Sequence, residues 1–365
     1  MGTYPRVGVS TASTPGYPGA VVVPIRSGLR YVTDAEPGIR RTGTKRFRYT
    51  DAATGRVITN DKVVDRIKRI AVPPAWTDVW ICSDPDGHLQ ATGRDARGRK
   101  QYRYHLDFRA EREQTKFGEL VTFGEALGGL RKAIEHDLGG PGLGLERMVA
   151  LVVSLLECTY VRVGNECYAT SNKTYGLTTL RSQHVTVHGS TVRIRFVGKG
   201  GRKHDIAISD PKVSRLIRRC QELPGQLLFR YEDADGELRP VTSTEVNDYL
   251  RDHTGLDVTA KTFRTWGATL FAAAGLAALP TARTNRQRQL AIKVVVETVA
   301  RELRNTPAVA RASYIHPLVF DTYENGTLHR LWEAGPSRAG GGLIAEERRL
   351  LQVLAPRRQR QRTAS

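Results

Sequence analysis

The stretch HVTVHGSTVRIRFVGKGGRKHDIAI, residues 184–208, decides how this chain folds. Its apolar and polar residues alternate in three runs, and glycine-bearing turns at 189–190 and 198–201 separate these runs. This pattern is typical of β-strands joined by two hairpins. The segments before and after it have helical spacing instead. We therefore expect a three-stranded antiparallel sheet within a mainly helical region.

The helical segments around these strands predict the rest of the larger domain. In LERMVALVVSLLECTYV, residues 145–161, apolar residues recur every three or four positions and give a broad face for burial. Thr242 and Glu245 in TSTEVNDYLRDH have the spacing of a capping box at a helix start. Further helices are expected around Arg264, through LAIKVVVETVARELR (290–304) and across EERRLLQVL (346–354).

The N-terminal third of the chain has strand-and-turn patterning. RFRYTDAATGRVI (46–58) places turn residues between two β-rich runs, and residues 79–105 repeat this arrangement. The predicted fold class is α+β, with a small β-rich N-terminal domain and a larger, mainly α catalytic domain that holds the three-stranded antiparallel sheet. The predicted boundaries are 1–28 for a disordered lead-in rich in Gly, Pro, Ser and Thr, 29–114 and 115–350 for the two domains, and 351–365 for a basic tail.

The composition is strongly basic. The chain has 56 Lys and Arg against 37 Asp and Glu, a formal net charge of +19. Basic residues run through the middle of the chain as well as through RRQRQR (357–362), so a basic tail alone does not explain the charge. We expect a polyanionic partner, and nucleic acid is favoured over an anionic membrane surface. FAAAGLAAL (271–279), the longest apolar stretch, is far shorter than the ~20 residues of a membrane-spanning helix.

Cysteine and carboxylate patterns predict neither a metal nor another cofactor. The four cysteines have no CxxC pair and no zinc spacing: Cys82, Cys158, Cys167 and Cys220. With no secretion signal recognisable at the N-terminus, they are expected to be reduced thiols in a cytoplasmic protein. Asp233, Asp235 and Glu237 follow only part of an EF-hand spacing, and a polar hairpin turn accounts for them better.

Three basic residues have positions that suit phosphate chemistry. Arg162 ends a buried helix, Lys199 lies at a glycine-rich hairpin tip, and Arg264 interrupts an apolar helical face. Cations in such places can stabilise the charge that develops on non-bridging oxygens when a phosphodiester is displaced in line. Taken singly, each residue also has a structural explanation: a surface cap, a solvated turn lysine and a salt bridge, respectively. GKGG also lacks the frame of a phosphate-binding P-loop.

Taken in order, these residues resemble those of the type IB DNA topoisomerases, specifically the small poxvirus and bacterial branch. The resemblance extends from about residue 29 to residue 345. Five segments carry it: YVRVGNECYATSNKTYGLTTLRSQHV (160–185), RFVGKGGRKHDI (195–206), KTFRTWGAT (261–269), NTPAVARASYIHP (305–317) and AVPPAWTDVWICSDPDGHLQATGRDARGRKQYRYH (71–105). The first four are similar to the family's first-arginine, lysine-hairpin, second-arginine and nucleophile segments. The last is similar to the first domain of the bacterial members.

The resemblance implies a role for each catalytic candidate. Tyr314 would attack the scissile phosphodiester, form a 3′-phosphotyrosyl link and release a 5′-hydroxyl strand. Arg162 and Arg264 would bind the non-bridging oxygens, and Lys199 would protonate the leaving 5′-oxygen. The two arginines and the lysine would also favour the phenolate of Tyr314, whose unperturbed pKa is ~10. The implied activity is relaxation of supercoiled DNA by transient single-strand cleavage, swivelling and religation, without ATP or metal.

Asn305 departs from part of the family. The poxvirus and eukaryotic members use histidine at this position, whereas many bacterial members use asparagine. An asparagine side chain can donate a hydrogen bond to a non-bridging oxygen but cannot carry a proton or a charge. We therefore expect Asn305 to stabilise the transition state by hydrogen bonding, and an acid–base role for this position is in doubt.

DNA contacts are expected mainly in the first domain. GRDARGRKQYRYH (93–105) interleaves cations with tyrosines, and the family's first domain contacts the major groove with this segment. The candidates are Arg99, Lys100, Tyr102 and Tyr104; the alternative is a solvated basic strand with tyrosines packed underneath. Tyr168 stands at a family position that touches DNA near the cleavage site. The implied partner is double-stranded DNA, gripped by a nucleoid-associated monomer with modules on opposite sides of the duplex.

Two other functions share part of this pattern. A tyrosine site-specific recombinase has the same Arg–Lys–Arg–Tyr chemistry, but it usually carries His-x-x-Arg where this chain has Lys261 and Arg264. The β-rich first domain also favours a topoisomerase, because recombinases have a helical bundle there. A non-catalytic basic protein that coats DNA would fit the composition alone, but it would form no covalent adduct.

Overall fold

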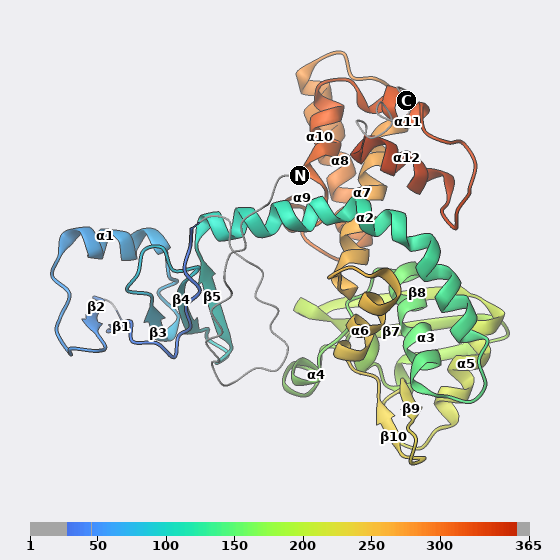
Figure 1. Ribbon diagram of the computed structural model, residues 1–365, viewed down its shortest axis with the longest axis horizontal. Coiled ribbons are helices and arrows are strands. Elements are labelled where there is room, and N and C mark those ends of the chain that lie inside the picture. The colour runs from blue at the N-terminus through green and yellow to red at the C-terminus, as the bar shows by residue number, and fades with distance from the viewer. Residues whose placement is uncertain (1–27, 45, 356–365) are drawn as a thin grey trace, which may run out of the picture. The chain divides into compact units, whose positions relative to one another are not determined.

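A computed structural model describes residues 28–44 and 46–355 of the chain (Figure 1). The chain divides into two compact units, Met1–Gln114 and Thr115–Ser365. Each unit has hydrophobic core clusters of its own. Residues 1–27 of the predicted lead-in and 356–365 of the predicted tail lie outside the described residues.

The first unit is built on a five-stranded antiparallel sheet with the strand order β2-β1-β3-β4-β5. Its strands are β1 (Ile39–Thr42), β2 (Arg48–Asp51), β3 (Thr77–Ile81), β4 (Leu89–Arg94) and β5 (Lys100–Tyr104). The prediction of a β-rich domain is confirmed. The hairpin expected within 46–58 is reduced to one isolated bridge between Thr50 and Val57 on one edge of β2, while the other edge of β2 pairs along its whole length with β1.

Helix α1 (Asp61–Ile70) lies among these strands and is not evident from the strand-and-turn pattern. Asn60 caps its start by accepting the Lys62 N–H at 3.0 Å, and Ala71 ends it in the left-handed conformation. Ile67 of the helix packs in a small core with Ile39 and Ile81 of the sheet. The helix therefore covers apolar residues of strands that would otherwise face water.

Helix α2 (Leu106–Leu138) runs from the first unit into the second. It begins before the domain boundary that the sequence suggests at residue 115. Phe123, Leu127 and Leu130 on this helix are fully buried in the core of the second unit. Because these residues recur at helical spacing, they fix which side of α2 faces that core.

The second unit is mainly helical, as predicted. Its further helices are α3 (Leu145–Thr159), α4 (Glu166–Asn172), α5 (Pro211–Glu222), α6 (Ser243–Thr254), α7 (Ala260–Ala277), α8 (Asn285–Glu302), α9 (Pro307–Ser313), α10 (Pro317–Glu324), α11 (Leu328–Glu333) and α12 (Ala345–Leu354). The predicted capping box is present, since Thr242 and Glu245 each accept the other's backbone N–H. Helix α12 continues past residue 350 because Val353 and Leu354 are buried in the core.

Residues 184–208 fold into the predicted three-stranded antiparallel sheet, β6-β7-β8. Its strands are β6 (Val185–His188), β7 (Thr191–Gly198) and β8 (Arg202–Ser209). Alternate residues of β7 are buried, and helix α5 contacts β6 and β7. The second turn is a short 3-10 turn, Lys199–Gly201, in which Gly200 and Gly201 have φ values of 76° and 74°. Glycine adopts this left-handed conformation without the steric cost of a side chain.

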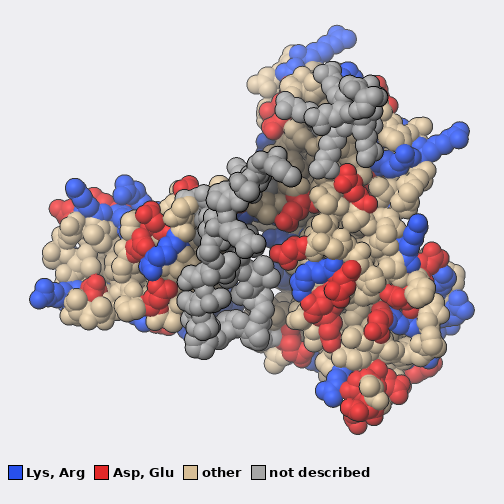
Figure 2. All heavy atoms as spheres, in the orientation of Figure 1, with Lys and Arg blue, Asp and Glu red and all other residues tan. Residues whose placement is uncertain are grey.

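The acidic group at 233–237 forms the turn between β9 (Arg230–Glu232) and β10 (Leu238–Pro240). Asp233 accepts the backbone N–H groups of Asp235 and Glu237 and pairs with Arg239, as a polar hairpin turn would. Figure 2 shows acidic side chains gathered at the tip of this hairpin, at the bottom of the view. Within residues 28–44 and 46–355, no three His, Cys, Asp or Glu side chains are grouped so that they could hold a metal ion.

None of the helices among the described residues combines the length and the apolar character that a membrane span needs.

Candidate active site

Arg162 lies in an irregular segment after α3, which ends at Thr159 rather than at Arg162 itself. Tyr160 stops the helix in the left-handed conformation, with φ 52°. Two glycines let the chain return against this segment: a side chain at Gly176 would place its Cβ 2.5 Å from the Arg162 carbonyl oxygen and 2.5 Å from Gly164. The Leu177 N–H also donates to the Arg162 carbonyl at 3.0 Å. The main chain of Arg162 is therefore fixed on both sides.

The Arg162 side chain reaches Asn305. Its Nη2 donates a hydrogen bond of 2.8 Å to Asn305 Oδ1. Asn305 follows α8, and its own N–H donates to the Ala300 carbonyl at 2.8 Å. The other side-chain atom of Asn305, Nδ2, is buried and has no hydrogen-bond partner among the described residues. A buried donor without a partner costs free energy. Asn305 Nδ2 is therefore available to an acceptor that the chain itself does not supply.

Arg264 is buried on α7, with 2% of its surface exposed. Its Nη1 donates to the Tyr160 carbonyl, and its Nη2 donates to the Leu303 carbonyl at 2.8 Å. These carbonyls lie just past the C-termini of α3 and α8, where the helix dipoles favour a cation. Burial lowers the pKa of Arg264, and the charge of Arg162 lowers it further, but a guanidinium stays charged at neutral pH. Its Nε is buried and unpartnered within the described part of the chain.

Tyr314 ends α9 and is 8% exposed. Its ring centre lies 5.1 Å from the guanidinium carbon of Arg264 and 5.9 Å from Lys261 Nζ. Burial opposes ionisation of the phenol, but the charges of Arg264, Arg162 and Lys261 outweigh this effect. The pKa of Tyr314 is consequently lowered from its ordinary value. The sequence had predicted such an effect from Arg162, Arg264 and a lysine.

One lysine beside the phenol, Lys261, is a residue that sequence reasoning did not assign to the site. Lys261 entered only as a feature that separates this chain from recombinases. Its spacing of three residues from Arg264 on a helix was the available signal, because residues three apart lie on the same helix face. Lys199, the predicted cation, lies at the exposed tip between β7 and β8.

The tip of the Lys199 hairpin and the strand residues next to it differ in their relation to the arginines. In the described part of the chain, no hydrogen bond or ion pair links Lys199 to the other four candidates. Two residue pairs below the tip, His204 of β8 is buried and stacks on Phe196 with ring centres 4.4 Å apart. Burial and then the charges of Arg304, Arg162 and Arg264 lower the pKa of His204 to about 4. His204 is therefore neutral at pH 7 and adds no charge beside the arginines.

Of the DNA-binding candidates of the first unit, Lys100, Tyr102 and Tyr104 lie on the edge strand β5, and Arg99 immediately precedes it. Tyr102 and Tyr104 are 48% and 41% exposed, and their rings are nearly parallel with centres 6.1 Å apart. The tyrosines are thus not packed underneath the strand. Arg99 Nη2 lies 2.6 Å from Asp95, and Lys100 Nζ lies 2.6 Å from Asp34. Both cations are paired with carboxylates of the same unit.

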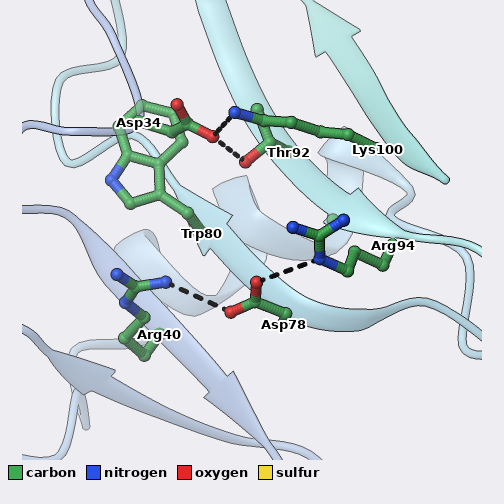
Figure 3. A pocket seen from close by; sticks show the side chains of 8 residues that line it. Asp34, Arg40, Asp78, Trp80, Thr92, Arg94 and Lys100 are labelled. Atoms are coloured by element: carbon green, nitrogen blue, oxygen red, sulfur yellow. Dashed lines mark hydrogen bonds and ion pairs between the residues drawn. The ribbon is translucent and has the colours of Figure 1, made fainter. Parts of the chain in front are cut away.

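Figure 3 shows Lys100 in a polar pocket on the sheet of the first unit. Asp34 accepts hydrogen bonds from both Lys100 and Thr92, and Asp78 lies 3.6 Å from Arg40 and 3.6 Å from Arg94. The carboxylates hold these cations in place, so a phosphate would have to compete with Asp34 for Lys100. In the second unit, Tyr168 on α4 is 47% exposed.

Two family models match the chain. The model described as "Eukaryotic DNA topoisomerase I, catalytic core" matches residues 105–329, more than half of the chain. The model described as "Bacterial DNA topoisomerase IB, N-terminal domain" matches residues 46–95. The first match includes the positions of Arg162, Arg264, Asn305 and Tyr314.

Curated relatives agree with these matches. DNA topoisomerase 1B of Acanthamoeba polyphaga mimivirus is 32% identical over 292 residues, which are 78% of this chain and 86% of the relative. DNA topoisomerase 1B of vaccinia virus (strain Copenhagen) is 23% identical over 172 residues, 45% of this chain and 54% of the relative. DNA topoisomerase 1 of Mycosarcoma maydis is 25% identical over 193 residues, 47% of this chain and 19% of the relative.

Proposed function

The chain belongs to the type IB DNA topoisomerases, and from that premise we propose which of its residues carry out the family's reaction, the relaxation of supercoiled DNA. One observation carries the proposal. Beside a tyrosine of lowered pKa, Arg264 Nε and Asn305 Nδ2 are buried donors without a partner among the described residues. A phosphodiester has the acceptor oxygens that these donors lack.

The scissile phosphate binds in the group formed by Arg162, Arg264 and Asn305. Its non-bridging oxygens accept hydrogen bonds from Arg264 Nε, from Asn305 Nδ2 and from Arg162 donors that do not face Asn305. These donors are held by main-chain and side-chain contacts before DNA arrives. Preorganised donors of this kind stabilise the charge of the transition state without reorganising during the reaction.

Tyr314 then exchanges one ester bond for another. Its phenol oxygen loses a proton and forms a bond to phosphorus, while the bond from phosphorus to the 5′-oxygen breaks. The product is a 3′-phosphotyrosyl ester and a free 5′-hydroxyl strand. Because a phosphodiester is kept, the 5′-hydroxyl can reverse the step without ATP after the strand has swivelled. The lowered pKa of Tyr314 supports this role.

Lys199 supplies the proton that the 5′-oxygen takes up. Its place at an exposed hairpin tip supports delivery by a loop movement on DNA binding, since Gly200 and Gly201 beside it offer no side-chain obstruction. Towards the phosphate, Asn305 acts as a hydrogen-bond donor and not as an acid, because its amide does not release a proton at neutral pH.

The duplex contacts proposed for the first unit are Arg99, Lys100, Tyr102 and Tyr104, with Tyr168 in the second. The exposure of the three tyrosine side chains supports their role in contacting DNA. The two basic residues would exchange Asp95 and Asp34 for phosphate oxygens, so we expect them to contribute less than the tyrosines. We propose that the protein is a monomer that grips opposite sides of the duplex; the division of one chain into two compact units supports this proposal.

Plasmid relaxation in EDTA without ATP tests the proposed function. The wild type should relax a supercoiled plasmid that carries no special site, whereas Tyr314→Phe should not, and both should bind DNA alike. Tyr323→Phe is a matched control, because the Tyr323 hydroxyl is buried and has no partner among the described residues. Relaxation by Tyr314→Phe would refute the assignment. Dependence on a particular site would favour a recombinase, and binding without any relaxation by the wild type would favour a DNA-coating protein.

A further inference from the structure

Tyr314 is the C-terminal cap of α9 and lies in the turn between α9 and α10. The N–H groups of Tyr314 and Ile315 both donate to the Ala310 carbonyl, at 3.1 and 3.2 Å. The last carbonyls of a helix have no partner within it. The turn therefore depends on outside groups to fix the carbonyls of Ser313 and Tyr314.

Lys116 on α2 provides the first outside contact. Its Nζ donates to the Ser313 carbonyl at 2.9 Å. The same ammonium lies 4.0 Å from the centre of the Phe117 ring, and that ring lies 5.0 Å from the ring of His316. Lys116 thus places a positive charge at the C-terminus of α9. Through the Phe117 ring it is also connected to His316, the residue that follows the turn.

Thr269 on α7 provides the second contact, and it is fully buried. Its Oγ1 accepts the His316 N–H at 3.1 Å. Its single hydroxyl proton has two carbonyl acceptors within reach of Oγ1, that of Thr265 at 2.7 Å and that of Tyr314 at 3.2 Å. One side chain therefore contacts the main chain immediately before and after Ile315.

Thr269 and Arg264 belong to the same helix, α7. They are five positions apart, about 7.5 Å along the helix axis. The nucleophile's main chain and the cation beside its ring are therefore both fixed to one rigid element. We infer that Thr269 and Lys116 are positioning residues that hold the Tyr314 oxygen in line with the phosphorus atom. This inference rests on the proposed role of Tyr314.

Substitutions of Thr269 separate positioning from chemistry. Thr269→Val keeps the shape of the side chain but removes the hydroxyl, so the turn can shift relative to Arg264. We expect about 10²-fold slower single-turnover cleavage, since a displacement near 1 Å has effects of this size, and unchanged non-covalent affinity for DNA. Thr269→Ser should restore most of the rate because it keeps the hydroxyl. Lys116→Met should slow cleavage by about 10-fold, and Lys116→Arg should restore it.

The pH profile of cleavage distinguishes positioning from a loss of stability. The charges that act on the phenol are those of Arg264 and Lys261 on α7 and of Arg162 after α3. If Thr269→Val lets the phenol move away from these charges, the pKa of Tyr314 rises. The pH–rate profile of the variant then shifts to higher pH. A variant that is only less stable keeps the wild-type profile when it is assayed well below its Tm.

The deciding experiment measures single-turnover cleavage from pH 6 to pH 10 with wild type, Thr269→Val, Thr269→Ser, Lys116→Met and Lys116→Arg, each checked for folding by circular dichroism. A slow Thr269→Val with a shifted profile and recovery in Thr269→Ser supports the inference. A folded Thr269→Val with the wild-type rate and profile overturns it. If Thr269→Val does not fold, Lys116→Met and Lys116→Arg take its place. A slow Lys116→Met with a shifted profile and recovery in Lys116→Arg then supports the inference, and a folded Lys116→Met with the wild-type rate and profile overturns it. No adduct with the wild type itself would instead refute the proposed function, and the inference with it.

Discussion

The guanidinium carbon of Arg264 lies 5.1 Å from the centre of the Tyr314 ring, in a site where both residues are more than nine-tenths buried. Burial alone would raise the pKa of a phenol. The opposite result, a lowered pKa, shows that the charges of the site outweigh the loss of hydration. A weak nucleophile thus gains phenolate character from fixed side-chain cations.

Removing the Arg264 charge should therefore shift the pH dependence of cleavage. Tyr314 must lose its proton, so the rate falls as the pH drops through its lowered pKa. Arg264→Met removes one of the charges that counteract burial, so the pKa of Tyr314 should rise. The pH–rate profile should therefore move to higher pH. Arg264→Met should also cleave ~10²-fold more slowly, the scale expected for loss of a preorganised donor. Single-turnover assays across pH would show both effects; a variant with an unshifted profile would argue against this source of activation.

Lys199→Ala should be rescued by a better leaving group. Cleavage of an ordinary phosphodiester should slow by ~10²-fold or more, within the usual range for general acid catalysis. A substrate with a 5′-bridging sulfur releases a thiolate, which needs no proton, so the variant should then approach the wild-type rate. Comparing the two substrates with both proteins provides the measurement. Equal defects on both substrates would exclude Lys199 as the proton donor.

Arg131 should be important for stability rather than for chemistry. It bridges Glu157 on α3 and Glu347 on α12, at 2.6 and 2.8 Å, and Glu347 is 3% exposed. Arg131→Met leaves the buried carboxylate of Glu347 and the partly buried one of Glu157 without their partner, which should cost about 3 kcal/mol of unfolding free energy. Arg193→Met is the control, because its pair with Asp205 is exposed to solvent and should contribute little to stability. Urea unfolding of both variants gives the comparison, and similar losses would contradict the prediction.

His204 should make the protein less stable in mild acid. Its pKa is about 4 in the folded chain, below the ~6.5 of an unfolded histidine. Between these values the unfolded state binds more protons, so the unfolding free energy falls as the pH drops from 6.5 towards 4. From pH 7 to pH 5 the loss from this residue should be roughly 1–2 kcal/mol. His204→Gln should lose correspondingly less over the same interval. If wild type and variant lose stability equally in urea titrations, His204 does not titrate in this way.

The features that could be predicted from the sequence are those that depend on residue patterns within short segments. Alternation and glycine turns specify β6, β7 and β8, and the order of Arg162, Arg264 and Tyr314 is enough to propose a candidate site before any geometry is known. Helix α1 escaped notice because it is short and lies between strand-like segments, although Val63, Ile67 and Ile70 recur at helical spacing. The start of α2 at Leu106 was also missed, since the preceding strand ends only at Tyr104.

The contacts that the sequence could not reveal join side chains to distant main-chain atoms. Lys116 and Ser313 are 197 positions apart, and Thr269 and Tyr314 are 45 apart. A carbonyl group is present at every residue, so no residue pattern marks which one a lysine or threonine will bind. The partners of Arg264 were hidden for the same reason, because both are carbonyls at helix ends.

The most direct test of the central claim is to trap the covalent intermediate and map it. A nicked duplex whose cleaved fragment diffuses away should capture the wild-type protein on the 3′ end of the DNA, in EDTA and without ATP. Proteolysis and mass spectrometry should then locate the nucleotide on Tyr314, and Tyr314→Phe should form no adduct. An adduct on another residue, or one joined to the 5′ end, would contradict the account.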